Sequence, residues 1–267
     1  MVLLPILIAS IVIPKLALLF VLLAAVALVL ALLEFWLLAR KQQIRSDPVA
    51  GLLGAAALFT VFYFTEPRKP PDLLVMVIVM ILLTICSLVA AMLRGAPFER
   101  MIASAGVTVL GVMYVVLLGG HLVALRTGFN QQLSMHLLAF FFLVLMGSDA
   151  AAYYGGRAFG RHKLAPNVSP GKTWEGAVAG MLASLLLASV AHYWFFPELS
   201  VKLALPLAAV MNVVGVLGDL TESALKRSAG AKDTAQILPG HGGMLDRIDS
   251  LLFNAPVIYY FAYAYFR

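Results

Sequence analysis

Long apolar runs, each followed by a short polar segment, succeed one another from one end of the chain to the other. A helix needs about 20 apolar residues to cross a hydrocarbon core of about 30 Å, and in lipid its backbone groups must bond to one another. The pattern therefore predicts an all-α fold, a polytopic membrane helix bundle of about nine transmembrane helices. The predicted spans are residues 1–14, 16–39, 49–64, 73–93, 101–125, 133–157, 176–196, 203–224 and 251–266.

The first predicted span is the least regular. It is short, it is bounded by Pro5 and Pro14, and little more than Lys15 separates it from the second span. It could therefore be a re-entrant segment or half of a hairpin.

Composition and charge agree with a membrane protein and orient it. Of the 267 residues 62% are hydrophobic and 12% are charged, whereas soluble domains carry about 25% charged residues. Loops after even-numbered spans hold 13 of the 19 Lys and Arg residues, so we expect them to face the cytoplasm, with the N-terminus inside and the C-terminus outside. Basic loops that face the anionic headgroups of the cytoplasmic leaflet explain the net charge of +6, so no nucleic-acid partner is needed to explain it.

Polar residues divide the chain into two predicted regions. Residues 1–130 read as transmembrane helices without motifs. Residues 131–267 carry most of the charged groups within and beside the apolar runs. We therefore expect the chemistry in the second region.

The span 203–224 and the residues after it carry a polar stripe. Residues three, four and seven apart share one face of a helix, and here that face is polar while the rest is apolar. An ionised aspartate such as Asp219 is costly in a membrane helix and needs a partner or a wet cavity. Pairing with a base such as Lys226 at the water boundary is the alternative, but it leaves the rest of the stripe unexplained. The stripe consists of Asn212, Gly215, Asp219, Glu222, Ser223 and Lys226.

A second polar cluster is the segment PGHGGMLDRID, residues 239–249. Its glycines, Gly242 and Gly243 among them, let the backbone approach a ligand closely, and backbone N–H groups can bind phosphate. Asp246 and Asp249 lie three apart at the start of the last helix, on one face. One of them could be a helix cap, but two exceed that need.

The residue types in these clusters favour a metal-nucleotide site. Carboxylates suit Mg²⁺, which is typically held by one or two carboxylates plus substrate phosphates. His241 has no nearby His or Cys, which argues against zinc. The basic residues have the right charge to bind phosphates; they are Lys226, Arg227, Lys232 and Arg247.

A third polar set lies between the sixth and seventh predicted spans. Asp149 is embedded in an apolar helix. A phosphate-binding loop around Lys172 is rejected, because Pro166 occupies the position of its first glycine. We expect residues 169–176 to begin a helix, with Thr173 near the cap and Lys172 reaching the same cavity; an ordinary basic loop is the alternative.

Across 27 residues the chain resembles the signature of the phosphatidate cytidylyltransferase, or CDP-diglyceride synthetase, family, and the segment SPGKTWEG resembles that family's shorter upstream motif. The matching positions are Ser223, Lys226, Arg227, Lys232, Asp233, Ala235, Leu238, Pro239, His241, Gly242, Gly243, Asp246, Arg247 and Asp249. The resemblance implies a bacterial inner-membrane enzyme, usually dimeric, that converts CTP and phosphatidic acid to CDP-diacylglycerol and pyrophosphate with Mg²⁺, with a second cation possible.

This resemblance gives the candidate residues roles. Asp219, Asp246 and Asp249 are predicted as metal ligands, and together with Lys226 and Arg227 as catalytic residues. Substrate binding is predicted for Lys172, Ser223, Lys232, Asp233, His241, Gly242, Gly243 and Arg247.

Two other functions stay open from the sequence. A CTP-dependent polyprenol or lipid kinase would use a similar nucleotide site but would need a base beside the accepting hydroxyl. An anion transporter would also carry intramembrane charges, although transporters commonly show two repeated halves and this chain has one polar half.

Overall fold

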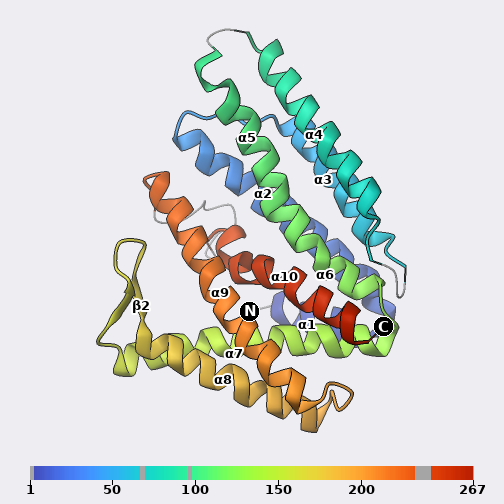
Figure 1. The fold of residues 1–267 in the computed structure, drawn as a ribbon, viewed down its shortest axis with the longest axis vertical. Coiled ribbons are helices and arrows are strands. Elements are labelled where there is room, and N and C mark those ends of the chain that lie inside the picture. Colours follow the sequence, from blue (N-terminus) through green and yellow to red (C-terminus); the bar gives the residue numbers. More distant parts are fainter. Residues whose placement is uncertain (1–2, 67–69, 96–97, 232–241, 267) are drawn as a thin grey trace.

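The computed structural model describes residues 3–66, 70–95, 98–231 and 242–266. Its main elements are α1 Leu3–Val12, α2 Ala17–Lys41, α3 Pro48–Tyr63, α4 Leu73–Leu93, α5 Met101–Gly111, α6 Leu118–Thr127, α7 Gln131–Phe159, β1 Lys163–Ala165, β2 Ser169–Thr173, α8 Trp174–Trp194, α9 Val201–Ser228 and α10 Leu245–Tyr265. A turn of π-helix, Val112–Leu117, joins α5 and α6 into one continuous helix. The predicted helix bundle is confirmed, with one helix in the place of each predicted span (Figure 1).

Six helices of the described chain are long and apolar enough to cross a membrane, so this is a multi-pass membrane protein. They are Pro14–Lys41, Leu73–Leu93, Phe98–Thr127, Gln131–Phe159, Trp174–Trp194 and Val201–Ser228. The other three predicted spans correspond to α1, α3 and α10. The helix α1 has ten residues and α3 has sixteen, so each is shorter than the hydrocarbon core requires.

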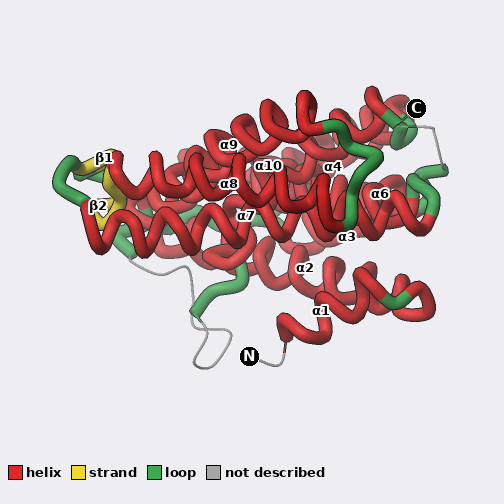
Figure 2. Tube along the Cα trace, turned by 90° about the horizontal axis from the view of Figure 1, so that it is seen from below, coloured by secondary structure: helices red, strands yellow, loops and turns green. Residues whose placement is uncertain are grey.

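A short antiparallel hairpin, β1 with β2, interrupts the helical fold between α7 and α8. Figure 2 shows this hairpin at one end of the molecule and the C-terminus at the other. The hairpin corrects the expectation that residues 169–176 begin a helix, because residues 169–173 pair with β1 and α8 begins at Trp174. Thr173 is the N-cap, as predicted, and accepts a hydrogen bond from the Gly176 N–H at 3.2 Å.

Close backbone contact holds α8 against α7, which lie side by side in Figure 1. A Cβ on Gly176 would lie 2.6 Å from the Ala152 carbonyl oxygen, so a larger residue would push the helices apart. Small residues at such interfaces let membrane helices approach closely. The hairpin between α7 and α8 is thereby held at a fixed place over α9.

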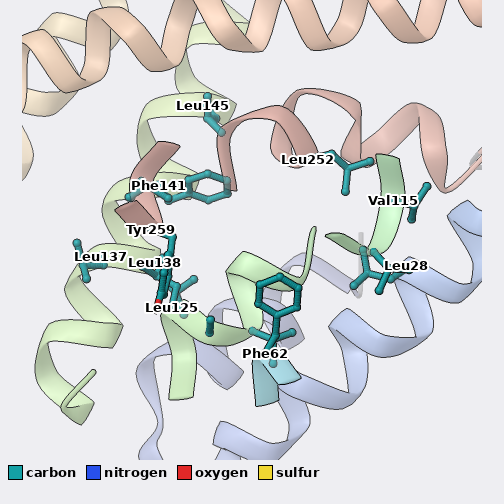
Figure 3. Packing of buried hydrophobic residues seen from close by; sticks show 14 of the residues in the cluster. Leu28, Phe62, Val115, Leu125, Leu137, Leu138, Phe141, Leu145, Leu252 and Tyr259 are labelled. Carbon is teal, nitrogen blue, oxygen red and sulfur yellow. The ribbon is translucent and has the colours of Figure 1, made fainter. Parts of the chain in front are cut away.

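The apolar core runs through both halves of the chain (Figure 3). Leu28 of α2 and Phe62 of α3 belong to the same cluster as Phe141 of α7, and Leu252 and Tyr259 of α10 complete it. The helix α10 begins at Leu245, six residues before the predicted span, and packs against both α6 and α9. Its charged first turn is therefore helical.

One loop junction is held by polar contacts. Asp47 caps α3 by accepting the Ala50 N–H at 2.8 Å, and Arg94 at the end of α4 donates to its other oxygen at 2.7 Å. The Asp47 N–H donates to the Thr108 hydroxyl on α5 at 2.8 Å. These bonds join three helices at one end of the apolar half.

Candidate active site

The polar stripe predicted on α9 forms one buried face. Asn212, Glu222 and Ser223 are buried, and Gly215 faces the Asn254 amide of α10. Asp219 is partly exposed within this face. The stripe therefore lines the contact of α9 with its neighbours, while Val213 and Leu217 on the other side are exposed and suit lipid.

Lys226 joins α9 to α10. Its Nζ lies 2.6 Å from Glu222 Oε2, one turn back on the same helix, and 2.9 Å from Asp246 Oδ1 on α10. Glu222 is 1% exposed. One ammonium group thus contacts a carboxyl group from each of the two helices.

Asp219 is paired with Lys172 of the β1–β2 hairpin rather than with Lys226. The hairpin reaches over α9, where Arg227 Nε also donates to the Val168 carbonyl at 3.3 Å. Lys172 was predicted to reach the same cavity, and its ion pair with Asp219 agrees with that prediction. The alternative, an ordinary basic loop, does not account for this pair.

A further group of acids surrounds Asp219. Asp149 of α7 and Asp249 of α10 both interact electrostatically with Asp219 and with Lys172. Ser250 on α10 donates to Asp149 at 3.5 Å. Helices α7, α9 and α10 therefore each direct at least one carboxylate toward the same place.

Gly218 lets α9 approach α10 closely. A Cβ there would lie 2.8 Å from the Asp249 carbonyl oxygen and 3.2 Å from the Phe253 ring. The backbone of α10 is the nearer obstacle and cannot move aside like a flexible side chain. The glycine beside Asp219 therefore sets the spacing between the acids of the two helices.

Glu34 of α2 is part of the site, although the sequence interpretation missed it. Its side chain is 0% exposed, and its two oxygens accept the N–H groups of Met244 and Leu245 at 2.8 and 2.7 Å. It thus caps α10 directly before Asp246, where a carboxylate favours a helix N-terminus. The sequence could have indicated Glu34 by its position, because it is the one charged residue among residues 16–39 and a charge within a membrane span is usually functional.

The remaining predicted residues fall into three groups. Gly242 has φ +75, a backbone conformation that glycine favours, and Gly243 after it is buried. Arg247 is exposed on the first turn of α10. Lys232, Asp233 and His241 lie outside the described residues.

Among the described residues the cluster contains more carboxyl groups than ammonium groups. It holds five carboxylates, from Asp149, Asp219, Glu222, Asp246 and Asp249, and two ammonium groups, from Lys172 and Lys226. In the described residues no three His, Cys, Asp or Glu side chains are arranged to hold a metal ion. Lysines instead hold three of the acids. Such a site can accept a further cation beside the acids, and an anion can compete with the acids for the lysines.

Comparison with known proteins places this cluster in a family. A family model described as the cytidylyltransferase family matches residues 1–265. The chain belongs to the cytidylyltransferase family. The match covers the apolar helices as well as the acid–lysine cluster.

Individual cytidylyltransferases align with part of the chain. A phosphatidate cytidylyltransferase of Haemophilus influenzae is 43% identical over 136 residues, which are 49% of this chain and 46% of that protein. One of Staphylococcus saprophyticus is 44% identical over 124 residues, which are 46% of this chain and 48% of that protein. The alignments span about half the length of the relatives.

Proposed function

We propose that this protein transfers the cytidylyl group of CTP to phosphatidic acid, forming CDP-diacylglycerol and pyrophosphate in phospholipid biosynthesis. Membership of the cytidylyltransferase family and the names of its relatives support a reaction of CTP with phosphatidate. The observation that carries the proposal is the acid–lysine cluster inside the membrane helices. Its lysines would bind the phosphates of CTP, and a lipid substrate can approach membrane helices from the bilayer.

The nucleophile of this reaction is a phosphate oxygen of phosphatidate, which attacks the α-phosphorus of CTP as pyrophosphate leaves. A phosphomonoester has a second pKa near 6, so at neutral pH it is already an anion. The enzyme therefore needs no general base. It needs to offset repulsion between two anionic substrates and to stabilise the charge that develops on pyrophosphate.

Lys172 and Lys226 are suited to this task because each is already held by acids at the site. In the free protein, Asp219 holds Lys172, while Glu222 and Asp246 hold Lys226. Phosphates of CTP would compete with these carboxylates for the lysines. Arg227, whose Nε lies at the hairpin, and Arg247 are the proposed additional phosphate contacts, and Ser223, Gly242 and Gly243 keep their predicted substrate-binding role.

The residues present fit Mg²⁺, which prefers carboxylate oxygens and keeps substrate phosphates among its ligands. The gathering of five carboxyl groups at one place supports this fit. One or two of Asp219, Asp246 and Asp249 would hold the ion together with substrate phosphates, since no three acids of the described residues are arranged as a metal site. When bound, Mg²⁺ would neutralise phosphate charge, and whether a second cation joins it stays a prediction.

Turnover of purified protein tests the proposed reaction against its rivals. With CTP labelled in the α-phosphate, phosphatidate and Mg²⁺, cytidylyl transfer gives pyrophosphate and a labelled lipid. A lipid kinase gives labelled CDP when a polyprenol is supplied. Labelled CTP recovered intact under both conditions contradicts both enzyme assignments and favours a transporter.

We also propose that the site faces the cytoplasm of a bacterial inner membrane and that the protein is a homodimer. Gly171 of the hairpin and Lys202 of α9 are exposed and lie on opposite predicted sides. In a Cys86→Ser background, Gly171→Cys should react with an impermeant thiol reagent from the inside and Lys202→Cys from the outside. The reverse labelling contradicts the orientation.

A further inference from the structure

The end of α6 holds a buried charge that the proposed reaction does not use. Arg126 is 6% exposed, its Nε has no hydrogen-bond partner, and no carboxylate of the described residues forms an ion pair with it. A buried guanidinium without a counter-charge is strongly unfavourable, and buried arginines are normally paired. A bound anion would therefore stabilise Arg126 in this position.

A cavity of about 270 Å³ lies beside this arginine. It opens between α1, the end of α6 and the start of α7. Its lining combines the buried cation with amide donors and apolar side chains: Arg126, Gln131, Gln132, Ile11, Val12 and Met135. Such a lining is complementary to a molecule that has an anionic group at one end and an apolar group at the other.

The cavity lies at the level of lipid headgroups. Arg126 is next to the last residue of a candidate membrane span, and Gln131 is the first residue of the following one. Asp149 lies 18 residues further along α7, about 27 Å at the rise of an α-helix. The cavity is therefore at the opposite end of α7 from the acid–lysine cluster.

We propose that this cavity binds the anionic headgroup of a membrane phospholipid, with a phosphate oxygen against Arg126. Arginine matches phosphate geometry with two parallel N–H donors, and the two glutamines can supply further ones. The exposed apolar side chains of Ile8 and Val12 on α1 give an acyl chain a surface to follow. The proposal does not depend on the reaction catalysed.

Thermal unfolding of the purified protein in a neutral detergent tests the site. Phosphatidylglycerol is the probe, because it is anionic and is neither substrate nor product of the proposed reaction; phosphatidylcholine and inorganic phosphate are the comparisons. A ligand that binds the folded state at well above its Kd should raise the melting temperature by about 5 °C or more. An equal rise with inorganic phosphate overturns the lipid assignment.

Two sets of variants make the result specific. Arg126→Gln removes the charge, so the phosphatidylglycerol shift should be lost, while the lipid-free variant unfolds at the same temperature as wild type or higher. A purely structural arginine would instead leave a variant that is less stable with and without lipid. Lys202→Gln, which removes an exposed charge elsewhere, should keep the full shift.

A second variant, at the exposed edge of the cavity, keeps the test valid if Arg126→Gln fails to fold. Gln131→Leu combined with Gln132→Leu removes amide donors from exposed positions and should reduce the shift while leaving lipid-free stability unchanged. If the wild type, this variant and Lys202→Gln all respond equally to phosphatidylglycerol, the proposed site is overturned.

Discussion

The helices α2 to α6, here called the apolar set, and the helices α7 to α10, here called the polar set, share one apolar core but differ in what they bury. The first set buries Leu32, Leu58 and Val115 and includes one fully buried carboxylate, Glu34. The second set gathers Asp149, the acids of α9 and α10, and two lysines. Packing is therefore distributed over the whole bundle, whereas charge is concentrated where chemistry is proposed.

Removing single carboxylates from the polar set should have the largest effect. Asp219→Asn and Asp246→Asn should each lower cytidylyl transfer by at least about 10²-fold, because each removes a charge that organises cations and phosphates. Residual activity should require more Mg²⁺. The measurement is lipid product formed against Mg²⁺ concentration, with membrane yield as the folding control. A near-normal rate at low Mg²⁺ would remove that residue from the metal site and make Asp149 the next candidate.

Glu34 tests whether the apolar set contributes to the site through α10. Glu34→Ala leaves the N–H groups of Met244 and Leu245 without these acceptors, and losing a helix cap costs roughly 0.5–2 kcal/mol. We expect about a 10-fold lower rate and a higher Mg²⁺ requirement, partly restored in Glu34→Gln.

The matched control for Glu34 is Ser87→Ala, a buried polar residue of α4 whose hydroxyl has no partner in the structure. It should leave both the rate and the Mg²⁺ requirement unchanged. If Glu34→Ala lowers only the amount of folded protein and keeps the wild-type Mg²⁺ dependence, Glu34 supports folding and does not position Asp246.

Gly218→Ala should separate α9 from α10 without removing any polar group. Its Cβ would contact the α10 backbone, and overpacking typically costs 1–3 kcal/mol. We expect a several-fold loss of turnover and a lower melting temperature. Gly106→Ala on α5, where a Cβ meets nothing within 4 Å, is the control and should change neither.

The smallest effect is expected at the loop junction of the apolar set. Burial raises the pKa of Asp47, but hydrogen bonds from Ala50 and Arg94 outweigh it and hold the pKa below its usual 3.8. The pair therefore stabilises the fold above pH 3.8, and this stability is lost as the pH falls through the lower folded value. Asp47→Asn keeps a cap and should cost about 0.2–1 kcal/mol in thermal unfolding at neutral pH, with unchanged turnover. A large loss of activity would show that the two sets are coupled here.

The sequence predicted much of this arrangement because periodicity and charge act locally. The stripe on α9 and the helical pair Asp246 and Asp249 follow from residue spacing alone. The partners did not, because ion pairs such as Lys172 with Asp219 depend on how the hairpin is folded over α9. Residues 169–173 form a strand because they pair with β1, a contact that their own pattern does not encode.

The bond between Glu34 and the start of α10 also orders the assembly of the protein. The carboxylate is synthesised about 210 residues before the N–H groups that it accepts. An acidic residue in a membrane helix is costly to insert, so α2 enters the bilayer with a cost that the last helix later offsets. A chain released before α10 is made lacks the two N–H donors that Glu34 accepts in the finished protein.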